Sequence, residues 1–165
     1  MPVTTFETRR ANPADADDIA AAHLDSIRSI GPRLYPAEVV DDWAAGVSAD
    51  LYIRAMKRGE VFFIALGIID GRRAVLGFSS HRVHGGEHRT AVYVRGSAAR
   101  QRIGSALFRL AEADAVAGGA HAIHVDASLA AVEFYRANGF VEVGRGEHKL
   151  RSGRLMPCVF MEKQW

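Results

Sequence analysis

A strand, a loop of small and basic residues and a helix follow one another in the part of the sequence best suited to chemistry. The strand ends at Val94, the loop is Gly96 to Gln101, and the helix is expected from Arg102 to Ala117. The first amides of a helix have no carbonyl partners, and together with the positive end of the helix dipole they bind phosphate groups. We therefore predict a pyrophosphate site whose donors are the amides from Arg100 to Ser105.

Basic residues and a glycine support this site. Arg100 and Arg102 supply positive charge beside the ligand, and Gly104 lets a ligand approach the backbone closely. The dinucleotide motif G-x-G-x-x-G and the P-loop motif G-x-x-x-x-G-K-[ST] do not occur in the sequence. A nucleotide-dependent dehydrogenase or kinase therefore has no support from motifs.

The segment from Asp126 to Phe140 contains the pattern A-x-x-F-Y-x-x-x-G-F. Its fixed positions are Ala131, Phe134, Tyr135, Gly139 and Phe140. The loop adds Val94, Ile103, Gly104 and Leu107 at the matching spacing. With these residues the chain resembles the GNAT superfamily of N-acetyltransferases, and the order of elements from Thr4 to Lys163 is similar over nearly the whole chain.

The phosphate loop departs from the family pattern, which reads roughly [QR]-G-x-G-[IV]-G. Ala99 stands at the first position, and Arg100 and Arg102 stand at the first two glycine positions. A second frame that begins at Gln101 matches some letters but breaks the spacing to Leu107. We expect Arg102 to adopt helical backbone angles, so that the substitutions bear on cofactor affinity and not on the fold.

The resemblance implies transfer of an acetyl group from acetyl-CoA, the co-substrate, to a primary amine of a small molecule or a peptide by direct attack. The backbone of Tyr93 and Val94 would pair with the amide groups of the pantetheine arm. The residues expected to bind the co-substrate are Tyr93, Val94, Ala99, Arg100, Gln101, Arg102, Ile103, Gly104, Ser105, Ser128 and Tyr135. Ser128 is also a candidate N-cap of the helix that follows it.

Tyr135 is the predicted general acid. A phenol with a pKa of about 10 can donate a proton to a thiolate whose conjugate acid has a pKa of about 8.5 only within hydrogen-bond reach. The alternative is that Tyr135 only packs in the core.

The base that deprotonates the amine is less clearly marked. The family often uses a carboxylate on the strand before the phosphate loop, and Arg89 to Val94 contains none. Glu87 and His88 lie just ahead of this strand and are the candidates. Neighbouring strands add His81, His84, His124 and Asp126, of which no single one stands out, and deprotonation through ordered water is equally open.

Composition places the chain among ordinary globular proteins. It has 165 residues, 48% of them hydrophobic and 24% charged, and a formal net charge of +2, which predicts a single domain over residues 1–165. The balance of charges argues against a dedicated nucleic-acid binder. No apolar run approaches the roughly 20 residues of a membrane helix, and no secretion signal precedes the domain.

Metal and redox chemistry find little support. The single cysteine, Cys158, excludes a disulfide within the chain and a cysteine-based metal cluster, which indicates a reducing compartment, by default the cytoplasm. The pairs His81-x-x-His84 and His121-x-x-His124 have members three apart on predicted strands, which point to opposite faces. We therefore predict no metal.

The expected fold class is α/β (α+β), a GNAT-like mixed and mostly antiparallel sheet with helices on both faces. The expected strands are Thr4–Arg10, Val61–Ile69, Ala74–Arg82, Arg89–Val94, His121–Ala127, Phe140–Leu150 and Leu155–Lys163. The expected helices begin at Asn12-Pro13, at Pro36, at Ser48, at Arg102 and at Leu129.

The sequence gives a segment for the acceptor side and a strand for contact with a partner. In the family the helical leading segment lines the acceptor side, which here is His23 to Asp50. The candidates are Arg28, Tyr35, Asp41, Asp42 and Trp43. Pro157 disfavours a central position for the last strand, which predicts an edge that pairs across a homodimer. The rival function is a non-catalytic acyl-CoA-binding sensor or regulatory module.

Overall fold

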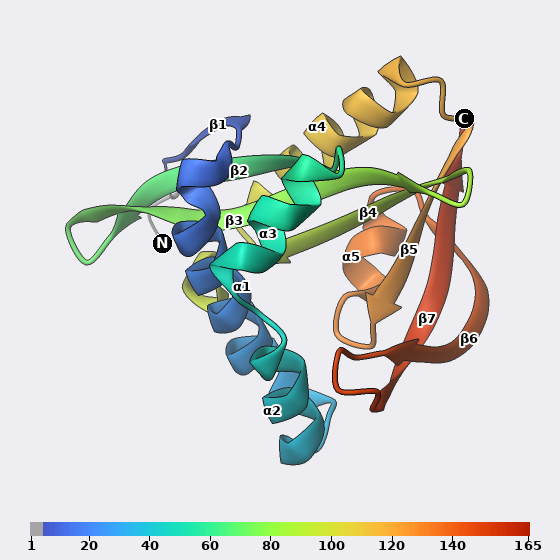
Figure 1. The fold of residues 1–165 in the computed structure, drawn as a ribbon, viewed down its shortest axis with the longest axis horizontal. Coiled ribbons are helices and arrows are strands. Elements are labelled where there is room, and N and C mark those ends of the chain that lie inside the picture. The colour runs from blue at the N-terminus through green and yellow to red at the C-terminus, as the bar shows by residue number, and fades with distance from the viewer. Residues whose placement is uncertain (1–4) are drawn as a thin grey trace.

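The computed structural model describes residues 5–165, in which a seven-stranded sheet carries helices on both faces (Figure 1). The strands are β1 (Glu7–Arg10), β2 (Val61–Ile69), β3 (Arg72–His84), β4 (Glu87–Val94), β5 (Ala122–Ser128), β6 (Val141–Lys149) and β7 (Leu155–Gln164). Their order across the sheet is β1-β2-β3-β4-β5-β7-β6, and only β4 and β5 are parallel. The predicted mixed, mostly antiparallel sheet is confirmed. Thr4, at the start of the first predicted strand, lies outside the described residues.

Five α-helices cover the sheet. They are α1 (Ala16–Ile30), α2 (Ala37–Ala45), α3 (Ala49–Lys57), α4 (Ile103–Ala117) and α5 (Val132–Ala137). On one face, α1 and α3 pack Ile19 and Tyr52 against Phe62 and Phe78. On the other, α4 packs against β2 and β3, and α5 packs over β5 and β7. Each apolar stripe is buried against the sheet, which accounts for the periodicity seen in the sequence.

Local signals set several boundaries correctly. Asn12 is the N-cap of the 3-10 turn Pro13–Asp15 that leads into α1, and its side chain accepts from the Ala14 amide at 3.0 Å. Asp70 and Gly71 both have positive φ, 50° and 76°, in the tight turn that joins β2 to β3. This is the backbone that a two-residue hairpin loop requires.

The last helix starts later than the sequence predicts. β5 extends to Ser128, and α5 begins only at Val132 with Ala131 as its N-cap. The prediction that Ser128 caps a helix is therefore wrong. Its carbonyl instead accepts from the Ala131 amide at 2.9 Å, closing a turn between β5 and α5.

The strand β7 lies between β5 and β6, so the expectation that Pro157 places it at an edge is wrong. Pro157 pairs with Glu147 of β6 but lies one residue outside the β5–β7 ladder, which ends at Ser128 and Cys158. Its carbonyl accepts from the Tyr35 hydroxyl at 2.6 Å. Since N and C=O of a strand residue point the same way, the missing N–H removes no bond to β6. β1 and β6 are the edges, so pairing of two copies through β7 has no free strand edge.

Candidate active site

The site lies where β4 and β5 separate. The two parallel strands share a single paired position, Arg89 with His124. Beyond it β4 continues to Val94 with its other side bonded to β3. The amide of Val92 points into the gap, where it donates to the Tyr135 hydroxyl at 3.1 Å. Residues two apart share an orientation, so the backbone of Val94 faces the gap as well.

Tyr93 does not present its backbone to the gap. Gly77 of the neighbouring strand β3 lies close to this backbone: a Cβ built on Gly77 would be 2.7 Å from the Tyr93 carbonyl oxygen. The Tyr93 carbonyl therefore points toward β3. The Tyr93 ring instead lines the cavity, and its ring centre lies 4.0 Å from that of His23. Burial raises the pKa of the Tyr93 phenol to about 12. Of the two predicted pantetheine partners, only Val94 has its backbone on the open side.

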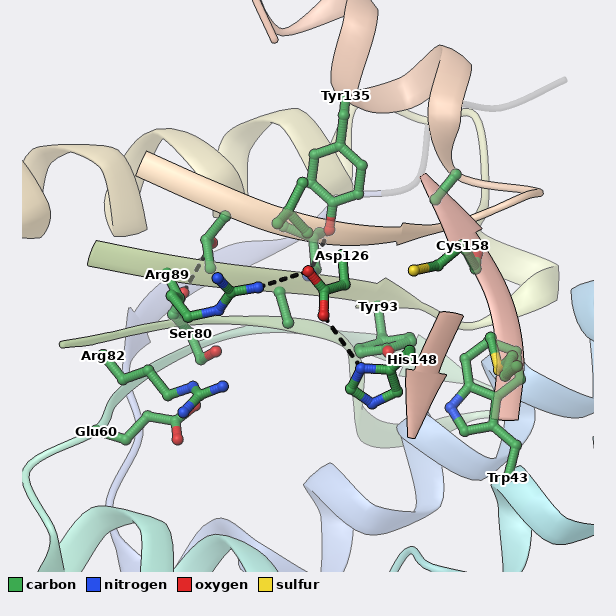
Figure 2. Close-up of a pocket in the computed structure, with 17 residues that line it drawn as sticks. Trp43, Glu60, Ser80, Arg82, Arg89, Tyr93, Asp126, Tyr135, His148 and Cys158 are labelled. Carbon is green, nitrogen blue, oxygen red and sulfur yellow. Dashed lines mark hydrogen bonds and ion pairs between the residues drawn. The ribbon is translucent and has the colours of Figure 1, made fainter. Parts of the chain in front are cut away.

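A cavity of about 150 Å³ opens beside this gap (Figure 2). It is lined from α2, the loop before β2, β3, β4, β5, α5, β6 and β7. Its residues are Trp43, Glu60, Ser80, Arg82, Arg89, Thr90, Ala91, Val92, Tyr93, Val125, Asp126, Ser128, Ala131, Tyr135, His148, Met156 and Cys158. Tyr135, Ser128 and Tyr93, which the sequence predicts as site residues, therefore meet in one place.

Tyr135 both packs in the core and reaches the cavity. Its ring is buried and packs against Phe134 and Phe140. Its hydroxyl reaches the cavity and accepts from the Val92 amide, an arrangement that leaves the phenolic proton available to donate. Burial raises the pKa of this phenol above its ordinary value, so the proton stays on the oxygen at neutral pH.

The phosphate loop adopts an unexpected backbone. Arg100 and Arg102 have φ values of 61° and 67°, in the left-handed region that favours glycine. The prediction of helical angles for Arg102 is wrong, because it is the N-cap of α4 and the helix starts at Ile103. The left-handed turn lets the Arg102 carbonyl accept from the Ala106 amide at 3.1 Å. The amides of Ile103, Gly104 and Ser105 thus precede the helical ladder, as a phosphate site needs.

Two glycines are required for packing around this loop. A Cβ on Gly104 would lie 2.8 Å from Phe134 Cε1, so this glycine lets α4 approach α5 closely. A Cβ on Gly96 would lie 2.5 Å from Ser29 Cβ of α1, and the Gly96 amide donates to Asp25 at 2.8 Å. The sequence suggests ligand approach as the reason for Gly104, and the structure adds a packing reason that pattern matching misses.

The two bases suggested by the sequence lie away from this cavity. His88 points to the α4 side of the sheet, where its Nδ1 lies 2.8 Å from Nε2 of His81, which in turn contacts Asp114 at 2.7 Å. Glu87 lies at the start of β4 and lines a second, neighbouring cavity. Neither is among the residues that line the cavity with Tyr135.

Two other acid–base groups do line it. Glu60, just before β2, has a carboxyl pKa raised by burial, an effect that hydrogen bonding from Ser80 opposes. His148 of β6 contacts Asp126 through Nδ1 at 3.2 Å (Figure 2). The bond from His148, together with the charge of Arg89, keeps the pKa of the Asp126 carboxyl below its ordinary value. A polar residue directly before an apolar strand is the one sequence signal for Glu60, and His148 has none.

The predicted acceptor-side residues divide into two groups. Trp43 lines the cavity, with its ring centre 6.3 Å from that of Tyr93. Tyr35 is structural, since its hydroxyl bridges Pro157 and the Leu129 amide. Asp41 and Asp42 form ion pairs with arginines on the surface and do not line the cavity.

Comparison with known proteins agrees with this geometry. The model of the acetyltransferase (GNAT) domain family matches residues 35–163. None of the curated proteins compared with the chain matches it. Within residues 5–165, the helices include none with the length and apolar character needed to cross a membrane.

Solved structures share the fold over the whole chain. A protein of Rhodopseudomonas palustris described as a GCN5-related N-acetyltransferase is 27% identical, with a TM-score of 0.83 and coverage of 100% of this chain and 99% of that one. The PaiA N-acetyltransferase of Thermoplasma acidophilum, solved in complex with coenzyme A, is 18% identical, with a TM-score of 0.75 and coverage of 98% and 99%. A ribosomal-protein-alanine N-acetyltransferase of Brucella melitensis is 22% identical, with a TM-score of 0.69 and coverage of 96% and 99%.

Proposed function

The chain belongs to the GNAT acetyltransferase family, and from this we propose that it transfers the acetyl group of acetyl-CoA to a primary amine by direct attack, with Tyr135 as the general acid. The observation that carries the proposal is the gap between β4 and β5, into which both the Tyr135 hydroxyl and the cavity open. An extended chain of amides can pair with the free side of β4 there.

The loop before α4 is the proposed diphosphate site. The amides of Ile103, Gly104 and Ser105 supply donors, and the side chains of Arg100 and Arg102 add positive charge. Ala99 and Gln101 complete the turn, with Gln101 donating to the Ser97 carbonyl at 3.3 Å. Holding the thioester in this way accelerates the reaction through orientation.

Tyr135 would complete the transfer. The amine nitrogen attacks the thioester carbon, the carbon–sulfur bond breaks, and the departing thiolate takes the phenolic proton. Val92 holds the phenol in place by donating to its oxygen, so that its O–H remains free for the sulfur. The phenolate then recovers a proton from solvent.

The amine must lose a proton before or during attack, and we assign this step to Glu60. Its raised pKa brings the carboxylate nearer to the neutral range in which a general base works best. The pair of His148 and Asp126 on the opposite wall is the second group that can accept this proton. Glu87 and His88 do not line the cavity, which removes the geometric basis for giving them this role.

Cys158 also lines the cavity but is poorly suited to carry the acetyl group. Burial and the nearby charge of Asp126 raise the pKa of its thiol to about 11. A protonated thiol is a weak nucleophile. Direct attack by the amine is therefore favoured over an acetyl-cysteine intermediate.

Release of free coenzyme A thiol, measured with a panel of small amines and peptides, tests the proposal. We expect release to exceed the rate of hydrolysis in buffer for at least one amine, with a product heavier by one acetyl group in mass spectrometry. Binding of acetyl-CoA with no amine-dependent release would instead support the non-catalytic sensor.

A further inference from the structure

Two arginines face each other across adjacent strands on the cavity side of the sheet. Arg82 of β3 and Arg89 of β4 occupy directly opposite positions in the antiparallel register. Like charges at such positions repel each other, because their Cβ atoms lie only about 5 Å apart. Counter-charges from the protein or from a ligand relieve this repulsion.

Within residues 5–165, only one of the two arginines forms ion pairs. Arg89 contacts Asp126 at 2.6 Å and Glu87 at 3.2 Å. Arg82 has no carboxylate within 4 Å anywhere in residues 5–165, and its acidic neighbour is Glu60, whose pKa it lowers less than burial raises it. Figure 2 shows Arg82 and Glu60 on the same wall, with the ion pair of Arg89 and Asp126 above them. The guanidinium of Arg82 is thus left without an ion-pair partner.

Arg82 also lies where two cavities meet. Arg82, Arg89, Val125 and Asp126 line both the cavity with Tyr135 and a second cavity, which continues along the strands between Val143 and Phe160. A molecule that occupies both cavities would therefore pass beside Arg82.

Arg82 lies too far along the sheet from Val94 to serve the diphosphate loop. Its partner Arg89 lies five residues before Val94, roughly 17 Å at the usual rise of about 3.4 Å per residue. The charge is therefore on the acceptor side.

We propose that Arg82 is an anion subsite for the acceptor, and that the acceptor is an amine that also carries an oxyanion, either a carboxylate or a phosphonate. The inference rests on the proposed acetyl transfer. The planar guanidinium binds both groups through paired hydrogen bonds. The carboxylates of Glu60 and Asp126 on the same cavity complement the amine end. A molecule with both charges would pair its oxyanion with Arg82 and its amine with these carboxylates.

The test compares the free α-amino acids with their carboxamides and with aminoalkylphosphonates, by release of coenzyme A thiol. We expect kcat/KM for the anionic acceptor to exceed that for its neutral amide at least tenfold. In Arg82→Gln this preference should vanish, because kcat/KM for the anionic acceptor falls through a higher KM, whereas kcat/KM for the amide changes only through the lost effect of Arg82 on Glu60. Arg82→Lys should restore part of it. Arg72→Gln, an exposed arginine at the start of the same strand, is the matched control and should behave as the unaltered enzyme.

The outcomes separate the inference from the proposed function. Equal rates with acids and amides, or equal loss of both in Arg82→Gln, overturn the anion subsite while leaving acetyl transfer intact. Absence of thiol release with every amine overturns the proposed function, and the inference with it. A preference for phosphonates over carboxylates, or the reverse, identifies which oxyanion the subsite takes.

Discussion

Among single side chains, the sequence predicts the proposed acid of the reaction but not the groups that can act as its base. Tyr135 is predicted from one motif, and the structure places its hydroxyl in the cavity with an oriented oxygen and an available proton. Glu60 and His148 could not be predicted, because they come from the residue before β2 and from β6 and meet only through the folding of the sheet. Glu87 and His88, the first residues of β4, are the candidates that the sequence offers, yet the alternation of strand side chains directs His88 to the far face.

Replacing Tyr135 by phenylalanine tests the acid. We expect kcat to fall about 100-fold, the lower range for general acid catalysis, while KM for acetyl-CoA changes less than twofold. Loss of the bond to the Val92 amide should lower the free energy of unfolding by about 1 kcal/mol.

Tyr52→Phe is the matched control for this change. It removes another buried hydroxyl, which contacts His23 Nδ1 at 2.6 Å and does not line the cavity. A similar decrease in kcat for both variants, or unchanged turnover of Tyr135→Phe over the full pH range, would remove Tyr135 from the mechanism.

At the scale of elements, the sequence predicts the order and type of nearly every helix and strand but not the backbone at their ends. Arg102 illustrates the reason, since its side chain gives no hint that the chain needs a left-handed residue before α4. Pro157 illustrates another, because its effect depends on which side of β7 lacks a partner. Such boundaries are decided by tertiary contacts, which local pattern does not contain.

The left-handed backbone at Arg102 predicts a gain in stability from glycine. A non-glycine residue in this region costs about 1 kcal/mol, so Arg102→Gly should raise the free energy of unfolding relative to Arg102→Ala by about that amount. Both variants lose the charge, and only alanine retains the strained angle. Urea unfolding of the two proteins measures the difference, and equal stabilities would show that the strain is absent.

Calorimetry on the same pair separates charge from shape. If the charge of Arg102 contributes to diphosphate binding, both variants should bind acetyl-CoA more weakly than the unaltered protein, and binding should weaken further as salt increases. Equal affinity in all three proteins would exclude Arg102 from the diphosphate site.

For the whole molecule, His23 of α1, whose Nε2 is buried, predicts how stability depends on pH. Burial between α1 and the sheet lowers the pKa of His23 to about 3. Its Nε2 has no hydrogen-bond partner within residues 5–165. The unfolded chain takes up a proton near pH 6.5 and the folded chain does not, so stability decreases as pH falls from 6.5 toward 3.

Between pH 6.5 and 5 this histidine should remove about 2 kcal/mol of stability, at about 1.4 kcal/mol per pH unit. Urea unfolding at pH 7.5, 6 and 5 measures the slope, and His23→Phe should flatten it even if the variant is less stable at every pH. Identical slopes in the two proteins would show that His23 is protonated in the folded state.

The sheet has two halves, β1 to β4 and β5 to β7, which share only the backbone pairing of Arg89 with His124. A substrate bound between them would supply hydrogen bonds that the two halves do not make to each other. The free energy of unfolding should therefore be higher for the enzyme with substrate bound than for the free enzyme. A hundredfold excess of such a ligand over its Kd adds about 2.7 kcal/mol to the folded state by mass action. The heat tolerance of this enzyme in a cell would then follow the supply of the very molecule that it consumes.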